Sequence, residues 1–410
     1  VSPAAERHQR GPSVTAARTS TAAPETDLDL FSTEVLLDPF PHYARLRDMG
    51  PVVYLTEYDL YGLFRYEQVR AALVDWETFS SAQGIAMNPT ANELSADSIL
   101  SVDPPRQRAL RKVFDDALRP KHVRRVAGDI EHLADDLVDS LVRRGEFDGV
   151  RDFACKLPVE IVMDLIGFPR DEHREELLEW ALGAFNFMGP PGERQESTFP
   201  DVQALMQYLV TEATPDRLLP GSFGQIVWEA ADRGEITGNE ALMAMSAYAC
   251  AGLDTTIAGV ASTLWLLALN PDQWRAVRQD PQLVPGTFLE GVRLETPLQF
   301  FSRVTTRDVE IDGVTIPRGA RVVHSYGSAN RDERRYPDPD RFDAHRNPVD
   351  TVGFGVGVHT CPGRALASME AHALFGALAR RATTIELAGE PTRSPNNITR
   401  GLDRLPVRVS

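Results

Sequence analysis

The fold of this chain is decided by the stretch Phe354-Gly355-Val356-Gly357-Val358-His359-Thr360-Cys361-Pro362-Gly363. Its glycines permit positive φ angles and a close approach of the main chain to a flat ligand. Pro362 favours a helix start just after the cysteine, and a long helix is expected over Arg364–Ala379. The dipole and free N–H groups of such a helix start lower the pKa of a thiol and hydrogen-bond a thiolate. Cys361 is therefore the candidate metal ligand, since such a thiolate suits haem iron. The alternative for a lone cysteine is a small core residue.

A second motif lies in the most apolar part of the chain. The segment Ala241–Leu269 carries Asp254 as its single charge. It is long enough to span a bilayer, but a carboxylate at its midpoint is costly in lipid, so a helix buried in a large helical protein fits better. At its centre stands Ala251-Gly252-Leu253-Asp254-Thr255-Thr256. A threonine in mid-helix can bond the carbonyl four residues back and open a kink. An acid and an alcohol side by side can relay protons.

A third motif, Glu290-Gly291-Val292-Arg293, falls in a helix expected around Val284–Glu295. Side chains at i and i+3 share a helix face and can form an ion pair; a solvated surface pair is the alternative. Helical patterns also dominate 105–142, 158–166, 171–184, 201–211 and 223–233. Strands are expected at 52–55, 60–65, 309–316 and 321–324, and a long loop at 79–102. These patterns predict a mainly helical body with a minor β region.

At these three motifs the chain resembles the cytochrome P450 superfamily of haem-thiolate monooxygenases, and the resemblance covers essentially everything after residue 27. It implies a triangular helical prism in which haem b lies between two long helices. The first is the buried I helix, here Ala241–Leu269, and the second is the L helix, here Arg364–Ala379. Asp254 and Thr255 match the family's catalytic acid–alcohol pair. The Glu–Arg pair matches a structural lock that holds the irregular stretch 331–350, here through Arg341 or Arg346.

The resemblance also assigns the residues that hold the cofactor. Cys361 would bind the iron, and the haem propionates would be bound by Arg111, Arg303 and His359. Gln107 replaces the histidine that is usual one turn before Arg111, which removes one expected hydrogen-bond donor. The main chain around the sulfur would be shaped by Phe354, Gly355 and Gly363.

Composition limits the other possibilities. The 410 residues carry 43 basic and 59 acidic side chains, a formal net charge of −16, which repels nucleic acid. Three distant cysteines, Cys155, Cys250 and Cys361, form no disulfide framework. Residues 1–26 are rich in small and polar residues and lack an export signal, so they are expected to be a disordered leader. A single domain over 27–410, in the cytoplasm and outside the membrane, is the resulting expectation.

The sequence contains no flavin or dinucleotide fingerprint, so electrons are expected from a ferredoxin and its NAD(P)H-dependent reductase. The family's fold would gather basic residues on the side of Cys361, where they would steer an acidic ferredoxin. These residues are Arg111, Lys112, Lys121, Arg124, Arg125 and Arg364.

The sequence is also similar to the bacterial branch that oxidises para-substituted aromatics, typically by O-demethylating 4-methoxybenzoate. The similarity includes Gly50–Leu55, Gly189-Pro190-Pro191 and Gly327–Asp332. Candidate substrate-binding residues are Ser81, Gln83, Phe185, Met188, Ala247, Ala251 and Phe300. In that branch an arginine of the 79–102 loop binds the substrate carboxylate. Gln83 stands there in this chain and is a poor sole counter-ion, which favours a neutral methoxyphenol or alkylguaiacol over a methoxybenzoate.

Two other readings of the motifs remain open. A peroxide-driven haem enzyme usually replaces the acid–alcohol pair with an arginine, and Asp254-Thr255 argues against it. A non-catalytic haem sensor or carrier fits Cys361 but gives no reason for a proton relay. Substrate-dependent NADH consumption with added ferredoxin and reductase separates all three.

Overall fold

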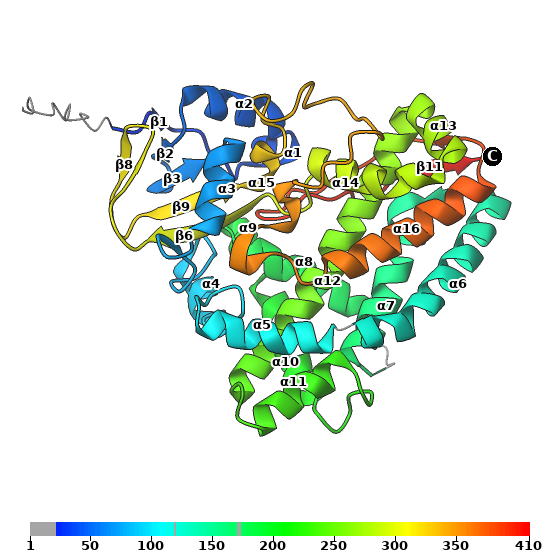
Figure 1. Cartoon of the computed structure of the whole chain (residues 1–410), viewed down its shortest axis with the longest axis horizontal. Helices are drawn as coiled ribbons and strands as arrows, with labels where there is room; N and C mark the ends of the chain where they lie inside the picture. The colour runs from blue at the N-terminus through cyan, green and yellow to red at the C-terminus, as the bar shows by residue number, and fades with distance from the viewer. Residues whose placement is uncertain (1–21, 119, 170–173) are drawn as a thin grey trace, which may run out of the picture.

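Most of the molecule is helical, and its larger sheet is gathered at one end, beside the start of the described chain (Figure 1). The computed structural model describes residues 22–118, 120–169 and 174–410, and the side chains of all these except 120–129, 174 and 175. The α-helices are α1 Thr33–Leu37, α2 Phe40–Met49, α3 Tyr66–Val74, α4 Pro89–Leu94, α5 Arg106–Ala117, α6 Pro120–Arg144, α7 Lys156–Ile166, α8 Arg174–Phe187, α9 Glu193–Glu196, α10 Phe199–Thr211, α11 Phe223–Asp232, α12 Gly238–Leu269, α13 Pro271–Gln279, α14 Val284–Leu294, α15 Tyr326–Ala329 and α16 Arg364–Arg381. A π-helical turn, Gly149–Ala154, and 3₁₀ turns at Pro281–Leu283, Val352–Phe354 and Gly357–His359 complete the helical elements.

The larger sheet has the strand order β1-β2-β3-β9-β6-β4. A second sheet joins β10, β11 and β5, and β7 pairs with β8 as a hairpin. The strands are β1 Glu25–Thr26, β2 Val53–Leu55, β3 Leu60–Leu63, β4 Phe79–Ser80, β5 Glu146–Asp148, β6 Phe300–Thr305, β7 Val309–Ile311, β8 Val314–Ile316, β9 Arg321–Ser325, β10 Ile385–Leu387 and β11 Pro406–Val409. The prediction of a mainly helical fold with a minor β region is confirmed.

The long apolar helix predicted from the sequence is α12, which runs through the centre of the molecule (Figure 1). Thr237 and Glu240 cap its first turn reciprocally: the Thr237 hydroxyl accepts from the Glu240 amide at 3.1 Å, and the Glu240 carboxylate accepts from the Thr237 amide at 2.6 Å. α7, α8, α11 and α14 pack around it. Among the described helices α12 alone has the length and apolar character to cross a membrane, but most of it is buried within the protein.

The structure differs from the sequence expectations in two segments. Residues 79–102 are not entirely loop, because Phe79–Ser80 pairs with β6 and Asn88 caps the short helix α4. The leader was expected to extend to residue 26, but Glu25–Thr26 already forms a strand that pairs in parallel with Tyr54–Leu55 of β2. The rest of that leader, residues 1–21, lies outside the described residues.

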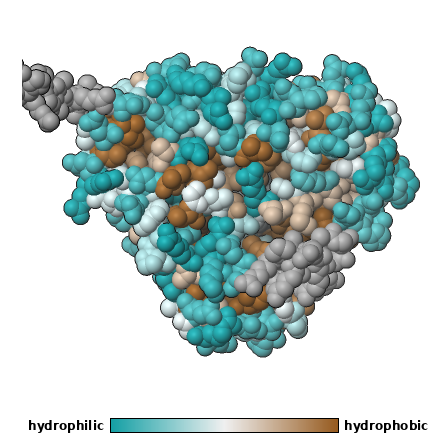
Figure 2. Space-filling model, viewed as in Figure 1, coloured by the Kyte–Doolittle hydropathy of each residue, from teal (hydrophilic) through white to brown (hydrophobic). Residues whose placement is uncertain are grey.

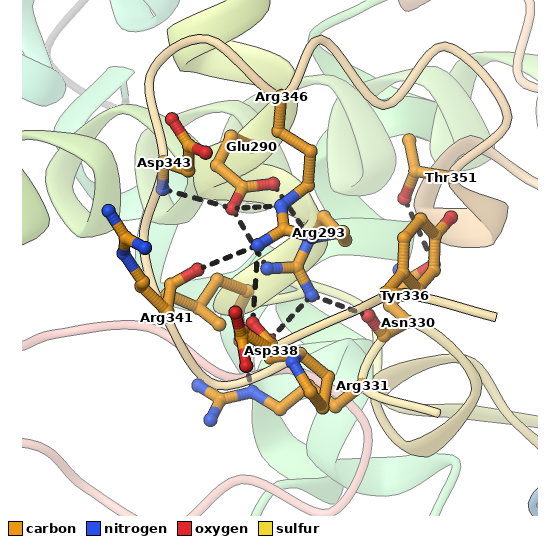
Figure 3. Close-up of polar contacts among 12 residues, drawn as sticks. Glu290, Arg293, Asn330, Arg331, Tyr336, Asp338, Arg341, Asp343, Arg346 and Thr351 are labelled. Carbon is orange, nitrogen blue, oxygen red and sulfur yellow. Dashed lines mark hydrogen bonds and ion pairs between the residues drawn. The ribbon is translucent and has the colours of Figure 1, made fainter. Parts of the chain in front are cut away.

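The Glu–Arg motif of α14 holds the irregular stretch 331–350 in place (Figure 3). Glu290 and Arg293 are both fully buried, and their side chains pair at 2.7 Å. Arg293 also donates to the carbonyls of Asn330 and Pro339, each at 2.8 Å. Arg346 completes the lock with 3.0 Å between its Nε and Glu290. Of the two arginines suggested by the sequence, Arg346 is therefore the partner, and Arg341 contributes only its main-chain carbonyl.

Figures 1 and 2 view the molecule from the side of α16 and the loop that precedes it. Hydrophilic residues dominate the outline of this face, and apolar residues appear in separate patches across its middle (Figure 2). α16 packs on α6 and α14, so the loop at its start is held between the helical body and the sheet end of the molecule.

Candidate functional site

The glycine-rich loop closes on itself around Cys361. The amide of Cys361 donates to the carbonyl of Phe354 at 2.8 Å. Gly355 and Gly357 have φ angles of +65° and +73°, and a side chain at Gly357 would collide with the carbonyl of Leu73 at 2.8 Å. Both positions therefore require glycine. The Cys361 sulfur lies at the N-terminus of α16, where the amides of Gly363 and Arg364 bond to it.

The electrostatics of this thiol differ from the sequence prediction. Burial raises the pKa of Cys361 above its usual value. The amides of Gly363 and Arg364 and the charges of Arg111 and Arg364 act in the opposite direction but do not outweigh burial. The predicted lowering is therefore wrong for the metal-free thiol, because the helix start is too well shielded from water. A bound metal deprotonates a coordinating thiol outright, and the two amides then stabilise the thiolate.

Two side chains of α5 brace the cysteine loop from outside. Gln107 donates from Nε2 to the carbonyl of Val358 at 2.7 Å. Arg111, one turn later, donates to the carbonyl of Thr360 at 2.6 Å and pairs with Asp115 at 2.8 Å. Gln107 thus takes a main-chain contact that positions the loop. Both residues were expected to bind the cofactor. In the structure they hold the two carbonyls that flank His359.

The predicted propionate-binding residues lie together near the end of β4. Arg303, on β6, is 5% exposed, and the one hydrogen bond found for its side chain goes to the carbonyl of Ser302 at 2.8 Å. Burial, helped by the positive charges of Arg303 and Arg111, lowers the pKa of the His359 imidazole to about 3. Ser81 joins them, with 3.1 Å between its hydroxyl and His359 Nε2. Ser81, predicted as a substrate residue, thus contacts one of the predicted propionate-binding residues.

Across the site, α12 presents a stripe of small side chains. Ala247, Ala251 and Thr255 follow one another at intervals of four and share a helix face. Ala251 is exposed and the other two are half-buried, in the middle of an otherwise buried helix. The Thr255 hydroxyl donates to the carbonyl of Ala251 at 2.7 Å, as predicted, while α12 runs without a break. Accessible space therefore borders the threonine of the acid–alcohol pair.

The acid of the pair is buried beside that stripe. Asp254 is 6% exposed, and its Oδ2 atom has no hydrogen-bond partner among the residues that the structure describes. Burial raises its pKa to about 6. An acid whose pKa lies near the working pH exchanges protons readily in both directions.

The predicted substrate residues are only partly brought together. Phe185, Met188 and Cys250 belong to one apolar cluster with Met87 and Phe301. Gln83 is exposed, and hydrogen bonds are found only for its main-chain carbonyl, which accepts from Arg321 at 2.9 Å. The sequence analysis did not single out Cys250 as a member of this cluster.

Phe300 is the clearest correction among the predicted substrate residues. It is fully buried against Phe31 and Tyr43, with ring centroids 5.6 Å and 5.9 Å away. Side chains alternate along a strand, so the face that carries Arg303 also carries Phe301 and not Phe300. Phe301 is therefore the aromatic residue of β6 on the side of the candidate cofactor site.

Two of the basic residues expected on the Cys361 side are paired with acids. Arg111 pairs with Asp115, and Lys112 with Asp116 at 3.3 Å. The Arg364 guanidinium stacks over the Phe354 ring at 5.1 Å. The side chains of Lys121, Arg124 and Arg125 lie outside those that the structure describes. The described part of this surface thus carries less free positive charge than the sequence suggested.

These residues fit haem. A lone thiol with two amides aimed at its sulfur suits one axial ligand, and the small side chains of α12 leave room for a bulky group. The buried Arg303 guanidinium, bonded here only to a neutral carbonyl, is suited to a propionate. No group of three or more histidine, cysteine or acidic side chains that could hold a metal ion occurs among the described residues.

Comparison with known proteins agrees with this geometry. Residues 217–398 match the family model described as Cytochrome P450. The chain is 38% identical to cytochrome P450 CYP199A2 of Rhodopseudomonas palustris, over 97% of this chain and 98% of the relative. It is 32% identical to cytochrome P450 107B1 of Saccharopolyspora erythraea, over 93% and 98%. Among solved structures it resembles P450BioI in complex with an acyl carrier protein, with a TM-score of 0.82 and 26% identity over 92% of this chain and 100% of that one.

The chain belongs to the cytochrome P450 family. It is a haem-dependent monooxygenase, and its cofactor is haem b.

Proposed function

We propose that this monooxygenase hydroxylates or O-demethylates a small para-substituted aromatic, with alkyl-methoxyphenols preferred to methoxybenzoates. It uses dioxygen and two electrons from a ferredoxin that an NAD(P)H-dependent reductase reduces. The observation that carries the proposal is the accessible stripe Ala247–Ala251–Thr255 beside the buried acid Asp254. A flat ring fits against small side chains, and the acid–alcohol pair at the end of the stripe supplies protons.

Haem held by a thiolate supplies the binding and activation of dioxygen. Cys361 would hold the iron, Gln107 and Arg111 fix the loop that presents the sulfur, and Arg303 with His359 would bind the propionates. Asp254 can take up and release a proton near neutral pH, because burial raises the pKa of its carboxyl to about 6. The Thr255 hydroxyl, which donates to the Ala251 carbonyl, is a hydrogen-bond donor on the accessible face.

The overall reaction on a methoxy group balances without a further reactant. An aryl methyl ether, dioxygen, two electrons and two protons give a phenol, formaldehyde and water. The two protons are the ones that Asp254 and Thr255 pass on. On an alkyl group the same inputs give an alcohol and water.

The preference for neutral rings rests on the loop that carries Gln83. This side chain is exposed and uncharged. The guanidinium of the neighbouring Arg321 donates hydrogen bonds to the carbonyls of Gln83, Gly84 and Ala86 and to the Ser302 hydroxyl. Arg321 therefore has its hydrogen-bond donors engaged by the protein and is not available as the counter-ion of a substrate carboxylate. Phe185, Met188 and Phe301 offer apolar surface for the ring.

A spin-state titration of the ferric protein tests the proposal. A 4-alkyl-2-methoxyphenol should shift the Soret band to high spin at lower concentration than 4-methoxybenzoate. Replacement Gln83→Arg should reverse this order, whereas Gln282→Arg, the same change at an exposed site in the 3₁₀ turn Pro281–Leu283, should not. Turnover with ferredoxin, reductase and NADH should then release formaldehyde. Tighter binding of the benzoate by the unmodified protein, or no response to either compound, contradicts the substrate assignment.

A further inference from the structure

We propose that Arg321 is a positioning residue that fixes one wall of the substrate pocket, the segment 83–88, by binding its main-chain carbonyls through the guanidinium group. The inference rests on the proposed function, because this segment carries Gln83 and belongs to the pocket assigned to the aromatic ring. It extends that function to a residue of β9, which none of the sequence motifs includes.

The Arg321 guanidinium binds the first part of this segment. Its Nη2 atom donates to the carbonyl of Gln83 at 2.9 Å. Its Nη1 atom donates to the carbonyls of Gly84 at 3.0 Å and Ala86 at 3.1 Å. These acceptors are uncharged main-chain oxygens, so the contact fixes the path of the chain. A planar guanidinium presents several donors in a fixed fork, whereas a lysine ammonium presents a compact point charge.

Ser302, on the neighbouring strand β6, completes the contact. Its hydroxyl accepts from Arg321 at 2.8 Å and lies 3.0 Å from the carbonyl oxygen of Ile85. The same hydroxyl lies 3.1 Å from the carbonyl oxygen of Ala86. The Ser302 amide also donates to the Ile85 carbonyl, at 2.9 Å. The four consecutive carbonyls of residues 83–86 are therefore bound by two side chains and one amide of the sheet.

The other end of the segment is bound to the end of α8 and the residues that follow it. The Met87 amide donates to the carbonyl of Met188 at 2.8 Å. The Asn88 side chain donates to the carbonyls of Phe187 and Gly189, each at 2.7 Å. The segment 83–88 thus bridges the sheet and α8, and Arg321 holds it at the sheet.

The apolar side chains of this bridge belong with the predicted substrate residues. Ile85 is 1% exposed and Met87 is 8% exposed. Both are members of the apolar cluster that contains Phe185, Met188 and Phe301. Without Arg321 the carbonyls at the sheet end would lose their donors, and these side chains would have to be ordered again when a ring binds. Such ordering lowers affinity, because its cost is subtracted from the energy of binding.

The binding of two imidazoles to the ferric haem protein tests this role without assuming a substrate. Imidazole is small enough to bind iron without the wall, whereas the phenyl ring of 4-phenylimidazole must also pack in the pocket. In Arg321→Met the apparent affinity for 4-phenylimidazole should fall about tenfold, as expected if the ordered wall drops to about a tenth of the population. The affinity for imidazole should stay unchanged. Arg318→Met, at an exposed site before β9, should change neither affinity.

Two further variants distinguish the fork from the charge and from the fold. Arg321→Lys keeps the positive charge without the fork, so its affinity for 4-phenylimidazole should stay close to that of Arg321→Met. Ser302→Ala removes the second side chain of the contact and should also weaken 4-phenylimidazole but not imidazole. This variant keeps the proposal testable if Arg321→Met does not fold. Amide hydrogen exchange in the peptide that covers 83–88 should be faster in all three variants than in Arg318→Met.

Two results would overturn the role of Arg321. One is a ratio of the two affinities that is unchanged in Arg321→Met and Ser302→Ala, or fully restored in Arg321→Lys. The other is an equal loss for both imidazoles, which indicates a general loss of structure. A methoxyphenol that leaves the spin state unchanged contradicts the proposed function instead. The imidazole comparison still judges Arg321 in that case, because neither probe depends on the substrate assignment.

Discussion

The guanidinium of Arg111 donates to the carbonyl of Thr360, 2.6 Å away, in the residue directly before Cys361. A side chain of α5 thus fixes the peptide that carries the candidate iron ligand. Replacement Arg111→Met should lower the free energy of unfolding by roughly 1.5–3 kcal/mol, the range for a hydrogen bond from a charged group, and should speed the loss of haem to an apoprotein acceptor. Arg108→Met, on the same helix and exposed, is the control. Equal haem loss from the two variants contradicts the role of this contact.

The buried pair of α14 should dominate stability rather than chemistry. Glu290 and Arg293 are fully buried and bonded to each other and to the 331–350 stretch. Breaking the pair with Arg293→Met should cost about 3–5 kcal/mol, because it leaves an uncompensated buried carboxylate. Urea unfolding measures this directly.

The matched control for that experiment is Arg341→Met, since Arg341 contributes only its main-chain carbonyl to the network. Its midpoint in urea should stay close to that of the unmodified protein. If Arg341→Met lowers the free energy of unfolding as much as Arg293→Met does, the Arg341 side chain takes part in the network. That result would contradict the assignment of Arg346 as the partner of Glu290.

Glu370 should make stability fall at alkaline pH. It lies on α16, and neither carboxyl oxygen has a hydrogen-bond partner among the described residues. Burial raises the pKa of Glu370 from 4.5 to about 8. A raised folded-state pKa stabilises the protein fully below pH 4.5, and this contribution is lost as the pH rises through about 8.

The free energy of unfolding of the unmodified protein should therefore drop between pH 7 and pH 9, by roughly 1–2 kcal/mol if Glu370 dominates this window. Glu370→Gln cannot ionise and should flatten this part of the curve. Asp254 does not interfere, because its pKa of about 6 puts its own titration largely below this window. An identical slope in both proteins rules out Glu370 as the cause.

Removal of the alcohol of the acid–alcohol pair should uncouple electron transfer from product formation. Thr255→Ala keeps Ala251, Cys361 and the pocket but loses the hydroxyl that now bonds to the Ala251 carbonyl. NAD(P)H consumption should continue while product per NAD(P)H falls at least about tenfold, a smaller loss than the roughly 10²–10⁴-fold that a positioned proton donor contributes.

Thr255→Ser should recover most of that yield. Thr263→Ala, two turns further along α12, removes a comparable bond to the Gly259 carbonyl and should leave the yield unchanged. Tight coupling in Thr255→Ala contradicts the relay.

The features that the sequence predicted well are those encoded in a short local pattern. The thiol loop, the long apolar helix and the buried Glu–Arg pair each have a spacing that only a few structures satisfy. The pKa of Cys361 was predicted with the wrong sign because helix-end effects are local, whereas burial depends on the tertiary packing around the sulfur. Contacts between distant segments, such as Ser81 with His359 or Gln107 with Val358, leave no trace in the linear pattern. The wrong assignment of Phe300 could have been avoided from the sequence. Side chains alternate along a strand, so Phe301 and not Phe300 lies on the same face as Arg303.

Carbon monoxide difference spectroscopy of the reduced protein tests most directly whether Cys361 is the thiolate ligand of haem. The unmodified protein, Cys155→Ser and Cys250→Ser should all show the red-shifted Soret band of thiolate-ligated haem. Cys361→Ser should lose that band. Retention of the thiolate band in Cys361→Ser, or its loss in Cys155→Ser or Cys250→Ser with Cys361 intact, would contradict the assignment on which the whole site is built.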